Sequence, residues 1–199
     1  MEKPIDNIRL RRLRGLQWLK PGQVLINLRY VETNLLPPHM DERVRRLRTN
    51  KLKQLREGRD AAIFAYGLET QVLKVPVWFA NAEQSDYDFV VRWVKEENEY
   101  FYPVQLKELP PEDLNTTESL DRIYDKLEKY SGADDLSVAV HVNKKMTLKW
   151  GPWERKKRPR VRQLWLFGST SPDQSKWFIC GDILKKPLFY EFAYPEGKP

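Results

Sequence analysis

The chain has 199 residues, of which 41% are hydrophobic and 32% charged, and its formal net charge is +7. This composition excludes a disordered chain and supports one globular core with a modest appendage, while Cys180 alone excludes an intrachain disulfide and a thiolate zinc site. Because no apolar run approaches the roughly 18 residues of a membrane span, we expect a protein that is cytoplasmic and makes no membrane contact.

Residues 1–40 predict an N-terminal extension. A basic amphipathic stretch over residues 8–19 favours a helix, and the alternating run over residues 24–31 favours a strand. The extension stops at Pro37 and Pro38, because proline continues neither kind of element.

Residues 41–150 predict the core domain, in the order helix, strand, strand, strand, helix, strand. Periodicity and breaker residues give the boundaries. The expected elements are a helix with Leu52, Leu55 and Ile63 on its apolar stripe that ends at Gly67, strands over 72–79, 88–94 and 100–106, a helix over 119–130 and a strand over 136–142. This order predicts an α/β fold, a mixed sheet with helices packed on it.

Residues 151–199 predict a basic linker followed by a C-terminal β-hairpin packed on the core. The hairpin strands are expected over 161–167 and 177–183 because a turn-rich segment separates them.

Three polar side chains are expected on one face of two neighbouring strands. Residues two apart share a face, so Gln105 and Lys107 point the same way. On the preceding strand the apolar face starts at Phe89, which puts Asp88 on the opposite face. If the apolar faces pack in one core, Asp88, Gln105 and Lys107 lie together. Asp86 shares the parity of Asp88 and is the alternative.

These residue types suit a hard divalent cation. Asp88 and Gln105 offer the oxygen ligands that Mg²⁺ (or Mn²⁺) prefers, so we predict both as metal ligands. Lys107 would orient or deprotonate the attacking water, or stabilise charge in the transition state. The alternative interpretation is a solvated strand face that binds nothing.

The arrangement resembles the PD-(D/E)XK nuclease superfamily. The order of elements over residues 51–142 is similar to the family core, with an Asp on the second strand and the (D/E)XK tripeptide on the third. Here the tripeptide is Gln105-Leu106-Lys107, which is similar to the QXK variant of the Mrr-type restriction endonucleases. The resemblance implies a restriction-endonuclease-like fold and metal-dependent hydrolysis of phosphodiester bonds.

The resemblance also implies a catalytic glutamate on the first helix. Glu57 is the candidate and Glu69 the alternative; Glu57 precedes Gly67 by ten residues, a spacing similar to the Mrr type. The expected apolar stripe through Leu55 and Ile63 puts Glu57 on the far side of that helix.

Clustered basic residues predict nucleic acid as the partner. The clusters lie within residues 9–14, 43–59 and 156–162. Each taken alone is as well explained by a solvated surface. In the third cluster we predict contacts to the nucleic-acid backbone from Lys156, Lys157, Arg158 and Arg160, because long cations in a Pro-interrupted segment reach phosphate without disturbing a core.

Two functions fit these features. The first is a metal-dependent nuclease that cleaves DNA or RNA. The second is a non-catalytic nucleic-acid-binding or structural protein that retains a nuclease-like fold. Metal binding distinguishes them, and both leave a homodimer open.

Overall fold

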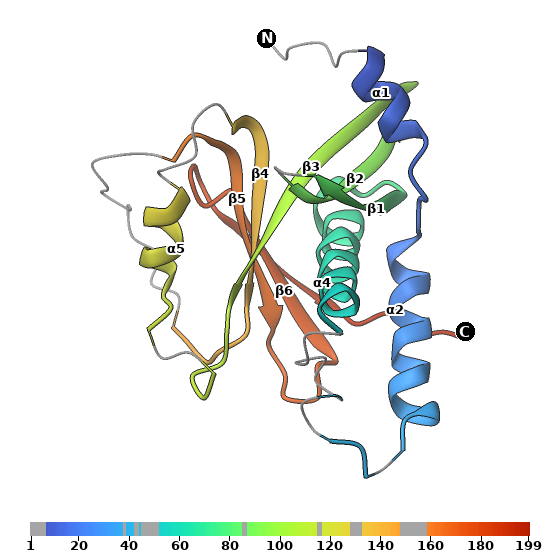
Figure 1. The fold of residues 1–199 in the computed structure, drawn as a ribbon, viewed down its shortest axis with the longest axis vertical. Coiled ribbons are helices and arrows are strands. Elements are labelled where there is room, and N and C mark those ends of the chain that lie inside the picture. The colour runs from blue at the N-terminus through green and yellow to red at the C-terminus, as the bar shows by residue number, and fades with distance from the viewer. Residues whose placement is uncertain are drawn as a thin grey trace.

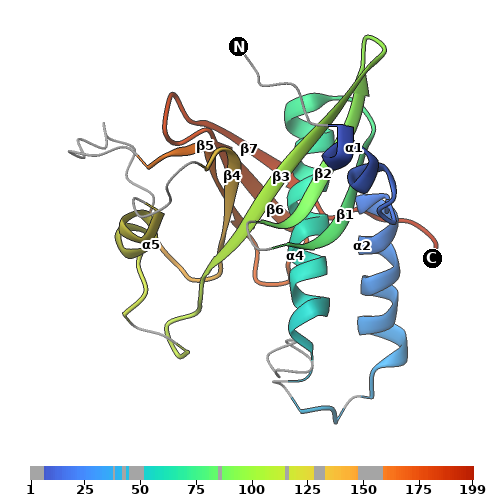
Figure 2. The ribbon, with the colours of Figure 1, turned by 45° about the horizontal axis from the view of Figure 1, so that its top comes forward.

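The computed structural model describes residues 7–37, 39–41, 44, 52–84, 87–114, 117–127, 133–147 and 159–199. These residues form a mixed α/β fold around one curled seven-stranded sheet, with helices on both faces (Figures 1 and 2). Among them, no helix is both long and apolar enough to cross a membrane.

The predicted order of elements in the core is confirmed. A π-helical turn, η1, follows the second helix, and another, η3, follows the helix that runs to Gly67. In chain order the elements are α1 (Asn7–Arg14), α2 (Pro21–Tyr30), η1 (Val31–Leu35), α4 (Lys53–Gly67), η3 (Leu68–Leu73), β1 (Val77–Gln84), β2 (Tyr87–Lys95), β3 (Asn98–Leu109), α5 (Leu120–Leu127), β4 (Ala133–Val142), β5 (Val161–Ser169), β6 (Lys176–Gly181) and β7 (Leu188–Ala193).

The strands lie in the sheet in their chain order. β1, β2 and β3 form an antiparallel meander, β3, β4 and β5 are parallel, and β6 and β7 return antiparallel. The tight β2–β3 turn has positive φ at Glu96 and Glu97, as a two-residue type I′ hairpin turn requires. Because β3 and β4 are parallel, their connection crosses a face of the sheet, and α5 lies in that connection.

Each face of the sheet has its own helices. The largest core cluster joins Leu25 of α2 and the buried side of α4 to Phe89, Val104 and Phe167 of the sheet. A second cluster packs α5 on the opposite face of the parallel strands, and a third packs Leu13 of α1 against β1–β4. Figure 1 shows α5 and α4 on opposite sides of the strands.

The N-terminal segment also covers the outer edge of β1. Leu19 and Phe79 form an isolated antiparallel bridge, in which the Leu19 N–H donates to the Phe79 oxygen at 2.8 Å and the Phe79 N–H donates to the Leu19 oxygen at 3.0 Å. β1 is therefore paired on both sides at this point.

The strand expected over residues 24–31 is wrong, because this segment is α2 continuing into the π-helical turn. Pro21 lies at the first turn of the helix, where its missing N–H costs nothing. The exposed residues Gln23, Asn27 and Tyr30 follow helical spacing, and Leu25 between them is fully buried. The segment is helical rather than extended because a helix lets its apolar side pack against α4.

The C-terminal segment differs from a separate hairpin. β5 and β6 pair antiparallel as predicted, but β5 also pairs in parallel with β4, so the hairpin extends the main sheet. β7 was not predicted. The strand expected over 72–79 is later in the chain, because residues 72 and 73 still belong to the π-helical turn and β1 starts at Val77.

Candidate functional site

Asp88 lies where β2 and β3 separate. Phe89 and Val104 are the last residues of the two strands whose backbones are in register. Beyond that pair, the Asp88 carboxylate takes the place of a backbone acceptor of β2. Its Oδ2 accepts hydrogen bonds from the Leu106 N–H at 2.7 Å and from the amide Nε2 of Gln105. The structure thus brings Asp88 and Gln105 into direct contact, and Asp88 also satisfies a backbone donor of β3.

A cavity of about 200 Å³ opens beside Asp88. Its walls come from α4, β1, β2 and β3, and they mix carboxylate and amide groups with apolar carbon. The lining residues are Gln54, Glu57, Ala61, Asn81, Asp88, Phe89 and Leu106.

Glu57 lines this cavity although the predicted apolar stripe placed it on the far side of α4. Leu55 of that stripe is 53% exposed and Ile63 is buried as predicted, but Ala61 and Phe64 on the side of Glu57 are buried as well. Glu57 lies one turn before Ala61, so it shares the inner side of the helix. The side chain of Glu57 is partly exposed and its carboxylate lies 3.4 Å from the Lys53 ammonium.

Glu69, the alternative to Glu57, lies beyond the C-terminal end of α4. Its carboxylate accepts the Val77 N–H at 3.3 Å. Burial raises the pKa of this carboxyl, although the Val77 hydrogen bond and Lys20 act in the opposite direction. Glu69 does not line the cavity that Asp88 and Glu57 share.

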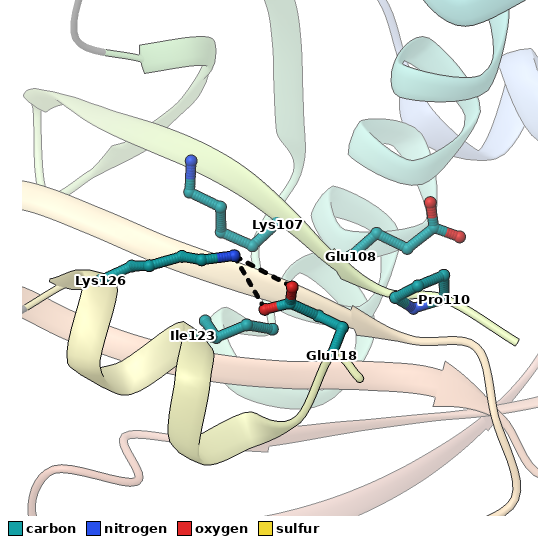
Figure 3. Close-up of a pocket in the computed structure, with 6 residues that line it drawn as sticks. All are labelled: Lys107, Glu108, Pro110, Glu118, Ile123 and Lys126. Carbon is teal, nitrogen blue, oxygen red and sulfur yellow. Dashed lines mark hydrogen bonds and ion pairs between the residues drawn. The ribbon is translucent and has the colours of Figure 1, made fainter. Parts of the chain in front are cut away.

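Lys107 lines a different cavity, of about 190 Å³, between β3 and α5 (Figure 3). There Lys126 forms an ion pair with Glu118 at 3.0 Å, and the Lys107 ammonium points away from that pair. Within the described part of the chain, Lys107 has no hydrogen bond or ion pair. The two cavities lie on opposite faces of β3.

Four of the other predicted site residues lie outside the described residues: Asp86, Lys156, Lys157 and Arg158. Arg160 is described and is exposed just before β5.

The donors around Asp88 are all oxygen and amide groups. The two carboxylates and the neighbouring amides fit a hard cation that keeps several waters, such as Mg²⁺, better than a soft metal. Within the described ranges, no group of three or more His, Cys, Asp or Glu side chains is gathered at one point. Any cation held here would therefore depend on two carboxylates, Glu57 and Asp88, together with amide oxygen, water and substrate.

Sequence reasoning missed two residues of the cavity, Gln54 and Asn81. Gln54 lies three residues before Glu57, so helical spacing could have found it. Asn81 is directly opposite Phe89 in the β1–β2 register, next to Asp88. It could be found only after the pairing of β1 with β2 was known, since the β1 boundaries were misplaced.

Comparison with known proteins adds no relative: no family model matches the chain, and no curated protein or solved structure gives a significant match.

Proposed function

We propose that the chain is a metal-dependent nuclease that hydrolyses phosphodiester bonds in DNA or RNA. The observation that carries the proposal is the shared cavity, in which Glu57 of α4 and Asp88 of β2 lie beside the point where β2 and β3 separate. Two carboxylates that reach one opening from different elements are a means of holding a cation against a phosphate.

The arrangement of strands supports a restriction-endonuclease-like topology in this proposal. An antiparallel meander of three strands, a crossover through α5 and a parallel fourth strand follow α4, with α4 and α5 on opposite faces. This is the order that the resemblance to the PD-(D/E)XK superfamily implies. Here Asp88 lies on its second strand and Gln105-Leu106-Lys107 on its third.

Each site residue has a distinct role in this proposal. A bound Mg²⁺ or Mn²⁺ would supply charge neutralisation at the scissile phosphate. Glu57 and Asp88 would hold it, and Gln105 orients the Asp88 carboxylate through its amide. Lys107, two residues further along β3, lines the cavity on the opposite face of that strand, so this proposal gives it no part at the cation.

Nucleic acid is the proposed partner because of the net charge of +7 and its clustering. The cations of residues 156–160 would bind the phosphate backbone beside the site rather than take part in the chemistry. Such contacts release counterions, so binding would weaken steeply with salt.

The direct test combines binding and cleavage. Titration calorimetry with Mn²⁺ should show binding to the wild type and a much weaker response from Glu57→Gln. Plasmid DNA and structured RNA should be cleaved in Mg²⁺ and left intact in EDTA. A folded wild-type protein that neither binds Mn²⁺ nor cleaves either substrate would refute the nuclease proposal.

One observation favours the second candidate, a non-catalytic nucleic-acid-binding protein. The Oδ2 of Asp88 is already engaged by the Leu106 N–H and by Gln105, so this carboxylate has a structural role that needs no metal. Salt-dependent binding of nucleic acid without Mn²⁺ binding would select this function.

A further inference from the structure

A buried ionisable pair lies one layer deeper than the candidate site. The Nδ1 of His141 on β4 lies 3.1 Å from the Oδ2 of Asp60 on α4, and the two residues are only 3% and 5% exposed. The imidazole ring stacks on Phe167 with 5.0 Å between ring centroids and contacts Trp177 at 5.7 Å. Because the aromatic rings fix the plane of the imidazole, the direction of its bond to Asp60 is fixed as well.

The ionised state of Asp60 fixes the direction of this hydrogen bond. Burial acts to raise the pKa of the Asp60 carboxyl, but His141, Arg59 and Arg56 together lower it below its usual value. An ionised carboxylate only accepts hydrogen bonds, so Nδ1 of His141 is the donor. The other oxygen of Asp60, Oδ1, is buried with no hydrogen bond from the described residues and lies 3.8 Å from Arg59 Nε.

Such a pair is a poor way to gain stability. Well-packed apolar residues of similar volume are often as stabilising as a buried ion pair, or more so. A hydrogen bond between two defined atoms does, however, specify how a helix is rotated and shifted along the sheet, and it can therefore set the register of the helix. On α4, Ala61, Ala62 and Ala65 are small, so apolar packing against the sheet depends on Ile63 and Phe64. The Asp60–His141 bond adds a directional contact to that packing.

On both α4 and β4, the pair lies close to residues that line the cavity or neighbour its lining. On α4, Asp60 follows Glu57 by three residues, so the two share a side of the helix about one turn apart. On β4, His141 follows Ala139 by two residues, and Ala139 is the register partner of Leu106. Leu106 in turn lines the cavity and donates its N–H to Asp88.

We propose that Asp60 and His141 are positioning residues that hold α4 in the register in which Glu57 shares the cavity with Asp88. The link to catalysis rests on the proposed function. The link to the position of α4 does not, because the hydrogen bond joins α4 to β4 whether or not a metal binds.

The test measures the position of α4 directly. Leu55→Cys on α4 and Val94→Cys on β2 introduce exposed spin-label sites, and the native Cys180 is buried, with burial raising the pKa of its thiol to about 11. Double electron–electron resonance on the labelled protein should give one narrow distance. In a His141→Phe background we expect a second distance or about a twofold broader distribution, and His141→Gln, which keeps a donor, should restore the narrow one.

A matched control separates positioning from stability. Val140→Ala removes buried volume from the same strand, but on the opposite face, so it should lower the melting temperature and leave the distance narrow. If His141→Phe does not fold, Asp60→Ala replaces it with the same expected broadening. If His141→Phe or Asp60→Ala folds and its distance distribution matches that of the wild type, the proposal is overturned.

Metal binding is read separately in the same proteins. Loss of a group that orients a metal ligand typically costs 10–100-fold in metal affinity, so Mn²⁺ affinity should fall about tenfold in His141→Phe and recover in His141→Gln. If the wild type binds no Mn²⁺, the nuclease proposal fails while the distance measurement still decides whether the pair positions α4. If Mn²⁺ affinity is unchanged although α4 has moved, the pair does not serve the site.

Discussion

The carboxylate of Asp88 accepts the backbone N–H of Leu106 at 2.7 Å, where β2 no longer reaches β3. Asp88 is therefore a structural acceptor as well as a candidate ligand. Asp88→Ala should lower the free energy of unfolding by about 1 kcal/mol, because the half-buried Leu106 donor loses its partner. Asp88→Asn keeps an acceptor and should unfold close to the wild type.

The same two variants separate structure from chemistry. Both remove the charged ligand, so both should abolish Mg²⁺-dependent cleavage, although only Asp88→Ala should show a lower urea midpoint. Full cleavage activity in a folded Asp88→Asn protein would show that the carboxylate is not part of the chemistry.

Glu57 offers a test with an internal control. Among the described residues Glu57 forms an ion pair with Lys53 alone, at 3.4 Å on the helix surface, so Glu57→Gln should change the stability by less than about 0.5 kcal/mol. It should nevertheless weaken Mn²⁺ binding and slow single-turnover cleavage. Lys53→Gln breaks the same ion pair and keeps the carboxylate. Equal loss of activity in both variants would mean that the ion pair, rather than ligation, is what matters.

Gln105→Glu would give the tripeptide the form that is commoner in the PD-(D/E)XK superfamily, which the proposed function invokes. In this chain it would place a second carboxylate against Asp88, and two such groups in contact raise the pKa of one of them. A raised pKa in the folded state costs stability as the pH rises, so the variant should melt near the wild type at pH 4 and lower at pH 7. Mg²⁺ should restore the melting temperature at pH 7, with cleavage retained. No response to Mg²⁺ would argue against a cation at this position.

The Asp60 carboxyl predicts a second pH dependence, of opposite sign. Its pKa in the folded protein is lowered, so its contribution to stability is present above the ordinary pKa of about 3.9 and is lost as the pH falls. The difference in free energy of unfolding between the wild type and Asp60→Asn should therefore be largest near pH 7 and shrink below about pH 4. Urea titrations at constant ionic strength measure it. A difference that stays constant from pH 7 to pH 3 would contradict an ionised Asp60.

Residues 156–160 are predicted to bind rather than to react. Replacing Lys156, Lys157, Arg158 and Arg160 with Ser should weaken nucleic-acid binding and flatten its dependence on salt, since fewer counterions are released. Cleavage at saturating substrate should keep its wild-type rate. The control replaces four exposed lysines elsewhere with Ser, which removes the same number of charges: Lys176, Lys185, Lys186 and Lys198. A slower rate with unchanged affinity would place this segment in the active site.

The order of the core elements was predictable because each has strong periodicity of its own. The burial of α4 was predicted only in part. Ile63 is buried as expected, but Leu55 is exposed, and the buried side that carries Ala61 was missed because alanine gives a weak hydrophobic signal. For the same reason Glu57 was placed away from the site. The apolar residues of α2 fit both the helical and the strand period, and only the contact with α4 distinguishes the two.

The candidate site was partly predictable from local parity. Asp88 and Gln105 meet because the alternation of Phe89 and Val104 sets the β2–β3 register. The Asp60–His141 pair joins residues 81 positions apart, and nothing local in either segment signals it. Long-range pairs of this kind depend on the packing of a helix on a sheet, which residue patterns do not encode.

The bridge between Leu19 and Phe79 also bears on how the protein behaves at high concentration. An unpaired strand edge is a template on which another chain can add a strand. Leu19 occupies the N–H and the C=O of Phe79, and the β1 edge is thereby closed to such growth at its centre. Proteolytic trimming of the segment before α2 would uncover an apolar strand that includes Val77 and Phe79, and would favour edge-to-edge aggregation.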